Sequence, residues 1–338
     1  MKPTIRITLI IICLASLWGA SCRKEVAGSA GPSGETLLDH LQNNYAFSLF
    51  YHALQRTGLD KQLNGKNNYT LLIPDNDAFA NDGIFTTDSL DRMDTASLRA
   101  WMSYHIVAGS IKVADVPQTV NNPYTSISGE PLWFSRPVPG FGQSQTDFDH
   151  ILHINGDTVN SPDIIAPDGV IQVLSSPLKL PVLSIQTWLS AQPQYSEFVT
   201  CLQHFGLWDQ LAGPGPITVF APENASFLDV RISPDSLSRL DTVRFQQKLF
   251  GIYIVNPARI FLTDFYDIPF PPSIDGQYYI TPNNTYNFSS GALIDGGLDP
   301  VTGQGIPNAY WIAPNLIMTN GVVHGMHGVL LTPGQTKK

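Results

Sequence analysis

The residues of this chain best suited to chemistry are its histidines, its carboxylates and one internal cysteine. Two histidine pairs share the spacing His-x-x-His, one at His150 and His153 and the other at His324 and His327. On a strand, residues three apart point to opposite faces of the sheet. Because a metal ion needs ligands that converge on it, we expect neither pair to bind one.

One turn carries two carboxylates, in the run Asp75-Asn76-Asp77. Calcium binding is one interpretation, and capping of the helix that follows is the other, since side-chain oxygens of Asp and Asn accept bonds from free helical N–H groups. A similar turn at Glu223-Asn224 continues with Ala225 in place of the second Asp. We therefore favour capping. Cys201 follows a helical apolar pattern and is expected to fill space in a core.

Patterns typical of catalysis are missing from the sequence. It contains no CxxC, HExxH, GxSxG or phosphate-loop motif. We therefore predict no catalytic residues, no metal site and no cofactor, and expect that the protein is not an enzyme. A hydrolase is the least favoured alternative.

Composition narrows the class of partner. The 338 residues include 19 Lys and Arg against 28 Asp and Glu, which gives a net charge of -9. Nucleic-acid binding needs a basic surface that neutralises phosphates, so we expect none. Hydrophobic residues make up 43% of the chain, enough to bury a sizeable core.

The first 35 residues have the features of an export segment. Lys2 and Arg6 precede an apolar run that is too short to span a bilayer, and small residues at 19–21 precede Cys22. We predict a signal peptide over residues 1–21. Small residues before a cysteine resemble the lipobox of bacterial lipoproteins, so Cys22 is the expected lipidation site, with plain cleavage as the alternative. Residues 22–35 then form a polar, Gly/Ser-rich tether.

The remaining chain contains an internal repeat. Residues 35–79 laid on 183–227 without a gap give 14 identities in 45 positions. Two further blocks, DSLDRMDT with DSLSRLDT and DGVIQVLSSPL with NGVVHGMHGVL, recur in the same order. Three blocks in one order indicate two copies of one domain, which we place at residues 36–181 and 182–334.

Each copy combines helices with buried strands. In the first copy the spacing of its apolar residues predicts a helix that ends near Gly58, a strand over 69–73, a helix whose face includes Trp101 and a closing strand over 170–174. The second copy predicts the same helix ending near Gly206, a strand over 217–221 and a closing strand over 322–330. The predicted fold class is α+β.

These repeated blocks resemble the fasciclin-like family, the FAS1 domain. Its first signature occurs as TLLIPDNDAF and as TVFAPENASF, its central Tyr-His pair as Tyr104-His105, and its last strand as NGVVHGMHGVL, with Gln172 replacing the histidine in copy one. The matching positions are Thr70, Pro74, Asn76 and Phe79 in copy one; Thr218, Pro222, Asn224 and Phe227 in copy two; and Asn320, Gly321 and His324 in the last strand.

The resemblance implies two tandem FAS1-like domains, each a β-sandwich wedge with packed helices. It also implies use in cell adhesion or ligand binding, without catalytic machinery. Copy two departs from the family where Ile252-Tyr253 replaces the Tyr-His pair. Its middle region, residues 258–312, also fits the family poorly.

That divergent region is rich in aromatic residues among Pro, Gly and Asn. Aromatic side chains on turn-rich segments provide contact area for sugars or proteins, although packing in the domain core is the favoured explanation for most of them. We predict a binding surface that includes Phe265, Tyr266, Tyr278 and Tyr279.

The favoured function is an exported, lipid-anchored protein of the cell envelope, on the outer membrane or cell surface, that binds a protein or polysaccharide ligand. A scaffold subunit of an envelope complex, with no ligand of its own, is the alternative.

Overall fold

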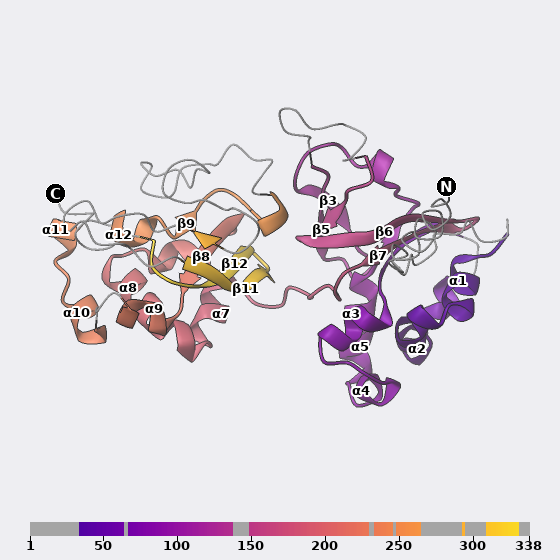
Figure 1. Cartoon of the computed structure of the whole chain (residues 1–338), viewed down its shortest axis with the longest axis horizontal. Coiled ribbons are helices and arrows are strands. Elements are labelled where there is room, and N and C mark those ends of the chain that lie inside the picture. The colour runs from indigo at the N-terminus through magenta and orange to yellow at the C-terminus, as the bar shows by residue number, and fades with distance from the viewer. Residues whose placement is uncertain are drawn as a thin grey trace, which may run out of the picture.

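The computed structural model describes residues 34–63, 67–137, 149–229, 233–245, 248–264, 293–294 and 309–330. They form two units in chain order, joined by a short connection around Pro181 (Figure 1). We call residues 34–180 domain one and residues 183–330 domain two. Each combines helices with a mixed sheet, which confirms the α+β class.

Domain one is built on a seven-stranded sheet in the order β2-β1-β7-β6-β5-β4-β3. Its strands are β1 (Tyr69–Pro74), β2 (Ile106–Ala108), β3 (Asn122–Thr125), β4 (Pro131–Ser135), β5 (His153–Ile154), β6 (Asp157–Ala166) and β7 (Gly169–Leu174). The central pair β1 and β7 is parallel, and the other neighbours are antiparallel. Strand β6 has two register shifts against β7, where it passes from one half of the sheet to the other.

The described residues of domain one also form the helices α1 (Leu37–Asn43), α2 (Ser48–Thr57), α3 (Asn76–Asn81), α4 (Thr87–Asp91) and α5 (Thr95–Tyr104). Side chains of β1 alternate between two apolar cores, Leu71 and Ile73 facing the helices and Leu72 facing the opposite side. A strand covered on both faces reads as a continuous apolar run, which is why 69–74 has no polar alternation. The predicted strand over 69–73 is confirmed.

Domain two repeats this plan around a five-stranded sheet in the order β10-β11-β12-β8-β9. Its strands are β8 (Ile217–Pro222), β9 (Ile254–Val255), β10 (Leu293–Ile294), β11 (Ala309–Met318) and β12 (Gly321–His327). Its helices are α7 (Ile185–Ser190), α8 (Ser196–His204), α9 (Asn224–Asp229), α10 (Pro234–Ser238), α11 (Thr242–Phe245) and α12 (Lys248–Gly251). Strands β8 and β12 are parallel, as are β1 and β7.

Short 3-10 helices complete the described part: η1 (Tyr45–Phe47), η2 (Asp60–Gln62), η3 (Val113–Asp115), η4 (Pro193–Tyr195), η5 (Trp208–Ala212) and η6 (Leu262–Asp264). The predicted helix stop is confirmed, because α2 ends at Gly58, which is left-handed at φ 69°. The closing strand of copy two ends three residues earlier than predicted, since β12 ends at His327.

A close backbone approach fixes the start of each closing strand. A Cβ added to Gly321 would lie 1.8 Å from the carbonyl oxygen of Ile217, and one added to Gly169 would lie 2.0 Å from that of Tyr69. No side chain fits at such a distance, so the central parallel pair of each domain requires glycine here.

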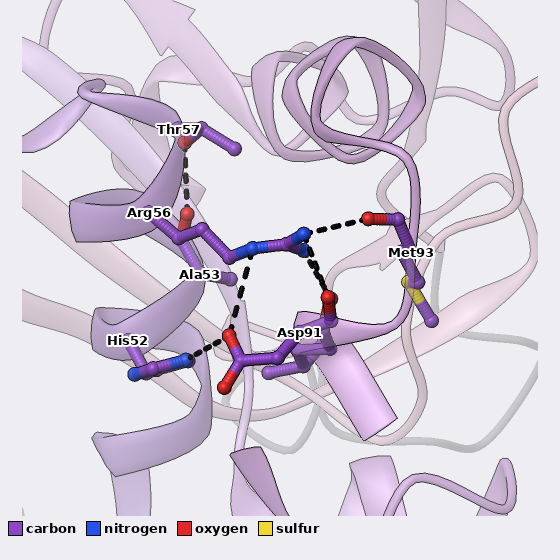
Figure 2. A network of polar contacts seen from close by, with 7 residues as sticks. His52, Ala53, Arg56, Thr57, Asp91 and Met93 are labelled. Atoms are coloured by element: carbon purple, nitrogen blue, oxygen red, sulfur yellow. Dashed lines mark hydrogen bonds and ion pairs between the residues drawn. The ribbon is translucent and has the colours of Figure 1, made fainter. Parts of the chain in front are cut away.

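Helix α4 is tied to α2 by one arginine (Figure 2). Arg56 donates to the carbonyl oxygens of Leu90, Asp91 and Met93, the last two at 2.8 and 2.7 Å. His52 adds a 2.8 Å bond to the Asp91 carboxylate. In domain two His204 occupies the place of Arg56 and bonds the Leu240 carbonyl at 2.6 Å. A cation or ring N–H at the end of a helix satisfies carbonyls that have no partner within the helix.

Candidate functional site

The threonine of the first signature lies on a central strand and bonds the loop after the neighbouring antiparallel strand. In domain one the strands are β1 and β2. The buried Thr70 hydroxyl donates to the Gly109 carbonyl at 2.6 Å and accepts from the N–H of Ile111 at 2.8 Å. Thr218 makes the same two bonds in domain two, to Ala258 at 2.9 Å and from Ile260 at 3.0 Å. Both hydroxyl functions are therefore used inside the fold.

The sequence predicts that the asparagine of this signature helps to cap its own helix. The structure shows a different role for it. Asp75 is the N-cap of α3, since its carboxylate accepts from the N–H of Ala78 at 2.8 Å. The Asn76 side chain reaches back along the chain instead, accepting from Leu49 N–H at 3.1 Å and donating to the Tyr45 carbonyl at 2.8 Å. It joins the start of α3 to the start of α2.

Asn224 makes the equivalent contacts in domain two, with Glu197 N–H at 3.0 Å and the Pro193 carbonyl at 3.0 Å. The other residues of this signature are also placed within the fold. Pro74 and Pro222 end strands β1 and β8, and Phe79 and Phe227 are buried in the cores.

The Tyr-His pair of domain one is fully enclosed. Tyr104 is 0% exposed and His105 is 1% exposed. His105 bonds the Trp101 carbonyl through Nδ1 at 3.0 Å, and its Nε2 accepts from the N–H of Leu178 at 3.0 Å. Burial lowers the pKa of His105 to about 4 and raises the pKa of Tyr104 well above its usual range. The imidazole is neutral at pH 7 and joins α5 to the segment after β7.

Tyr253 takes this role in domain two. Its hydroxyl accepts from the N–H of Leu330 at 2.7 Å, and Leu330 occupies the place of Leu178 in the repeat. With Ile252-Tyr253 in place of the Tyr-His pair, domain two therefore keeps the bond to the segment after its last strand that His105 makes in domain one. It loses the hydroxyl of Tyr104.

The last strand begins with an amide or carboxylate that fixes the first helix of its domain. Asn320 accepts from the N–H of Ile185 at 2.9 Å, and Asp168 accepts from that of Leu37 at 2.8 Å. Further along, His324 bonds the Ile260 carbonyl at 2.8 Å and accepts from Asn315 N–H at 3.2 Å. Burial lowers the pKa of His324 to about 4.

Gln172 replaces His324 in domain one with equivalent bonds. Its amide donates to the Ile111 carbonyl at 3.0 Å and accepts from the N–H of Asp163 at 3.0 Å. The imidazole of His324 can take up a proton and the amide of Gln172 cannot, yet both side chains make the same pattern of hydrogen bonds. This position is therefore defined by the need for one donor and one acceptor.

The two histidines of each His-x-x-His pair lie in different surroundings. His324 is buried, whereas His327 lies between two carboxylates, with Nδ1 at 2.6 Å from Glu223 and Nε2 at 2.7 Å from Asp229. These bonds raise the pKa of His327, the bond to Glu223 contributing most. In domain one His150 is exposed and His153 is partly buried.

Among the described residues, no three His, Cys, Asp or Glu side chains converge to hold a metal ion. Cys201 is buried in the core of domain two, and burial raises the pKa of its thiol. In the same part of the chain, no helix combines the length and apolar character that crossing a membrane requires.

Several predicted site residues fall outside the described part. They are the lipidation site Cys22 and the four aromatic residues of the predicted binding surface, Phe265, Tyr266, Tyr278 and Tyr279. The aromatic residues on either side of that surface differ in burial: Phe261 is fully buried, while Tyr310 is 44% exposed.

A hollow of about 290 Å³ lies where the two domains meet. Its polar side chains are already bonded within the protein. Asp157 accepts from Ser175 at 2.6 Å and from Ser176 at 2.8 Å, Lys179 pairs with Asp82, and Asn315 donates to the Gly156 carbonyl at 3.1 Å. The hollow therefore presents mainly apolar walls to solvent.

The contacts around this hollow were not expected from sequence. They join Asn121, Trp133 and Gly156 of domain one to Arg259, Phe261 and Asn315 of domain two. The sequence signal for these contacts is that the two copies carry residues of different chemical type at these positions.

Comparison with known proteins agrees with the repeated geometry. The sequence profile of the Fasciclin domain matches residues 45–181 and 193–332. A fasciclin-like arabinogalactan protein of Arthroderma benhamiae is 23% identical over 287 residues, covering 82% of this chain and 61% of its own length. The protein sll1483 of Synechocystis is 28% identical over 158 residues, covering 46% of this chain and 80% of its own length.

Among solved structures, a FAS1 domain pair from the insect cell adhesion molecule Fasciclin I aligns with 87% of this chain and 99% of its own. The TM-score is 0.38 and the identity 15%. The same set of threonine, asparagine and closing-strand contacts is made in both halves of the chain, and the profile matches cover most of it. The chain belongs to the fasciclin family and carries two fasciclin domains in tandem.

Proposed function

We propose that this protein is exported, is anchored by lipid at Cys22 in the bacterial cell envelope, and binds a protein or polysaccharide ligand at the cell surface without catalysing a reaction. The observation that carries the proposal is the tandem pair of fasciclin domains behind a signal-like segment and a polar tether. One relative of this chain is named a fasciclin-like arabinogalactan protein.

The use of the motif residues supports a binding role. In the described domains the signature threonines, asparagines and histidines are occupied by hydrogen bonds that hold the fold together. Such residues preserve a scaffold, and ligand contacts then come from variable surface segments. In domain two we assign that role to the predicted surface of Phe265, Tyr266, Tyr278 and Tyr279.

Electrostatics favours a lipid anchor over adsorption to an anionic membrane. Removal of the signal peptide takes away Lys2 and Arg6 and changes the net charge from -9 to -11. An acidic protein is repelled by anionic lipids, so attachment requires acyl chains.

The anchor is tested by mass spectrometry of the protein extracted from membranes. We expect an N-terminal acylated cysteine at position 22, and release of the Cys22→Ala variant from the membrane fraction. A Cys22→Ala variant that remains membrane-bound to the same extent would contradict the anchor.

Ligand binding is tested by pull-down from envelope extracts and polysaccharide arrays. We expect alanine at Phe265, Tyr266, Tyr278 or Tyr279 to weaken capture while changing the free energy of unfolding by less than ~1 kcal/mol, as surface substitutions usually do. A loss of about 3 to 5 kcal/mol, typical of a truncated core aromatic, would assign these residues to packing. Capture that depends only on other envelope subunits would favour the scaffold alternative.

A further inference from the structure

The two domains are joined by side chains that differ between the copies. The signature threonines and the loops after β2 and β9 align the copies here, so that Arg259, Phe261 and Asn315 of domain two correspond to Ser110, Lys112 and Asp163 of domain one. Ser110 and Lys112 are exposed in domain one, whereas Phe261 is fully buried. The same face is therefore open in one domain and covered in the other.

What covers this face in domain two is domain one. The Arg259 guanidinium carbon lies 4.0 Å from the centre of the Trp133 ring, and the Arg259 carbonyl accepts from Asn121 at 2.7 Å. The Asn315 amide donates to the Gly156 carbonyl at 3.1 Å. Burial lowers the pKa of Arg259 to about 10.

Phe261 completes the contact as its apolar centre. It packs with Ile317 and Val322 of domain two and against Trp133 of domain one. Gly156 lies so close that an added Cβ would be 2.8 Å from the Phe261 Cβ and 2.8 Å from the Asn315 side chain. We call the contact among Trp133, Gly156, Arg259, Phe261 and Asn315 the domain junction.

Tyr104 supports the domain-one side of this junction from within. Its hydroxyl donates to the Pro131 carbonyl at 2.9 Å and accepts from the Asn155 amide at 2.8 Å. Asn155 has a left-handed backbone (φ 53°) and is paired with Trp133 in both directions, at 2.9 and 2.8 Å. Tyr104 thereby holds the residue that precedes Gly156 and fixes the backbone of Trp133.

From these contacts we propose that Tyr104 is the positioning residue of the domain junction, and that the junction fixes the two fasciclin domains as one rigid unit with a constant relative orientation. The asymmetry of the repeat follows. Tyr104 is present in domain one, whose sheet contacts domain two. The amide donor Asn315 and the apolar Phe261 are present in domain two, on the face that makes this contact.

The face that domain two uses in the junction is not repeated on domain one. A contact between different faces of like units can continue into a chain of units. Domain one presents Ser110, Lys112 and Asp163 on the corresponding face, which lacks the aromatic and amide groups of the junction. A ligand that contacts both domains would gain from their fixed spacing.

Two variants test the proposal on the full chain by calorimetry and small-angle X-ray scattering. Tyr104→Phe removes one hydroxyl and keeps the ring in the core. Asn315→Asp removes the amide donor to Gly156 and installs the residue that domain one tolerates at Asp163. For the parent we expect a ratio of calorimetric to van't Hoff enthalpy near 1, as for one cooperative unit.

Both variants should raise that ratio toward about 2, because two domains then unfold independently, and should lengthen the particle in solution. Two matched controls leave the junction intact. Tyr253→Phe removes the buried hydroxyl of domain two, and Asp163→Asn makes the reciprocal change in domain one; both should keep a ratio near 1. The measurement involves no ligand, so its outcome is separate from that of the binding proposal.

Three results would overturn the proposal. One is a parent chain whose two domains already unfold independently. Another is unchanged coupling and scattering in both Tyr104→Phe and Asn315→Asp. The last is equal loss of coupling in Tyr104→Phe and Tyr253→Phe, which would mean that Tyr104 contributes to the stability of its own domain alone.

Discussion

The backbone N–H of Leu178 donates to Nε2 of His105 at 3.0 Å, across 73 residues of chain, in a fully buried position. The bond requires a neutral imidazole whose Nδ1 carries the proton, because Nδ1 faces the Trp101 carbonyl at 3.0 Å. His324 is held in the same way in domain two, between a carbonyl and an N–H. Each domain therefore contains one buried histidine whose protonation conflicts with its hydrogen bonds.

We expect these histidines to make the protein sensitive to acid. Their pKa is lowered from 6.5 to about 4 in the folded state by burial. Below pH 6.5 the unfolded chain takes up protons that the folded chain does not, so stability falls from about pH 6.5 to about pH 4. At one pKa unit per 1.36 kcal/mol, each histidine costs about 3 kcal/mol at pH 4.

The His324→Gln variant checks this dependence, because Gln172 already fills the equivalent position in domain one. We expect its unfolding free energy, measured by denaturant titration between pH 7 and pH 4, to fall less steeply than that of the parent. Substitution of the exposed His150 by Gln serves as the control and should leave the slope unchanged. Equal slopes for His324→Gln and the parent would contradict the lowered pKa.

His327 should have the opposite dependence. Both ring nitrogens face carboxylates, at 2.6 Å and 2.7 Å, so the bonds favour the protonated ring and raise its pKa above 6.5. The described groups that face it are Glu223, Asp229 and the Tyr310 ring, which stacks on it at 4.9 Å. The stabilisation is complete below pH 6.5 and is lost as pH rises through the raised pKa.

The His327→Gln variant should be less stable than the parent at pH 6, and the difference should shrink as the pH rises above 7. The readout is the Tm of domain two across this range, compared with Asp229→Asn, which should give a smaller change in the same direction. A difference that stays constant with pH would show that His327 acts through packing alone.

The asparagine of the first signature should matter more than the helix cap beside it. Asn76→Ala removes bonds to Leu49 and Tyr45 that join two helices, whereas Asp75→Ala removes one cap worth ~1 kcal/mol. With each of these two hydrogen bonds contributing roughly 1 kcal/mol, we expect Asn76→Ala to cost about 2 kcal/mol of unfolding free energy. Asn76→Asp keeps the acceptor for Leu49, so its loss of unfolding free energy should lie between the losses of Asn76→Ala and Asp75→Ala. An equal or greater loss for Asp75→Ala would show that capping dominates.

The glycine that opens the last strand should tolerate no side chain. In Gly321→Ala the new Cβ would lie 1.8 Å from the Ile217 carbonyl oxygen, which forces the parallel strands apart. We expect the loss to exceed the ~1 to 2 kcal/mol of left-handed backbone strain. Gly83→Ala is the matched control, since Gly83 has φ 83° with open space around it. Similar losses in the two variants would show that the strands move apart at little cost.

The sequence by itself determined the elements and their repetition. Strands such as 69–74 and 217–222 are recognisable because a strand buried on both faces is apolar throughout, and that pattern is local. The helix end at Gly58 follows from a left-handed residue, and the two copies follow from blocks in one order.

Only the tertiary structure decided what the motif side chains contact. Asn76 was expected to serve the helix in which it lies, yet its partners come 27 and 31 residues earlier in the chain. Tyr104 and Asn315 acquire their roles through Asn155 and Gly156, which reach them only once the sheets have folded and the domains have met. A residue type specifies which bonds a side chain can make, whereas the choice of partner depends on the packing of distant segments, because the same donors and acceptors recur throughout the sequence.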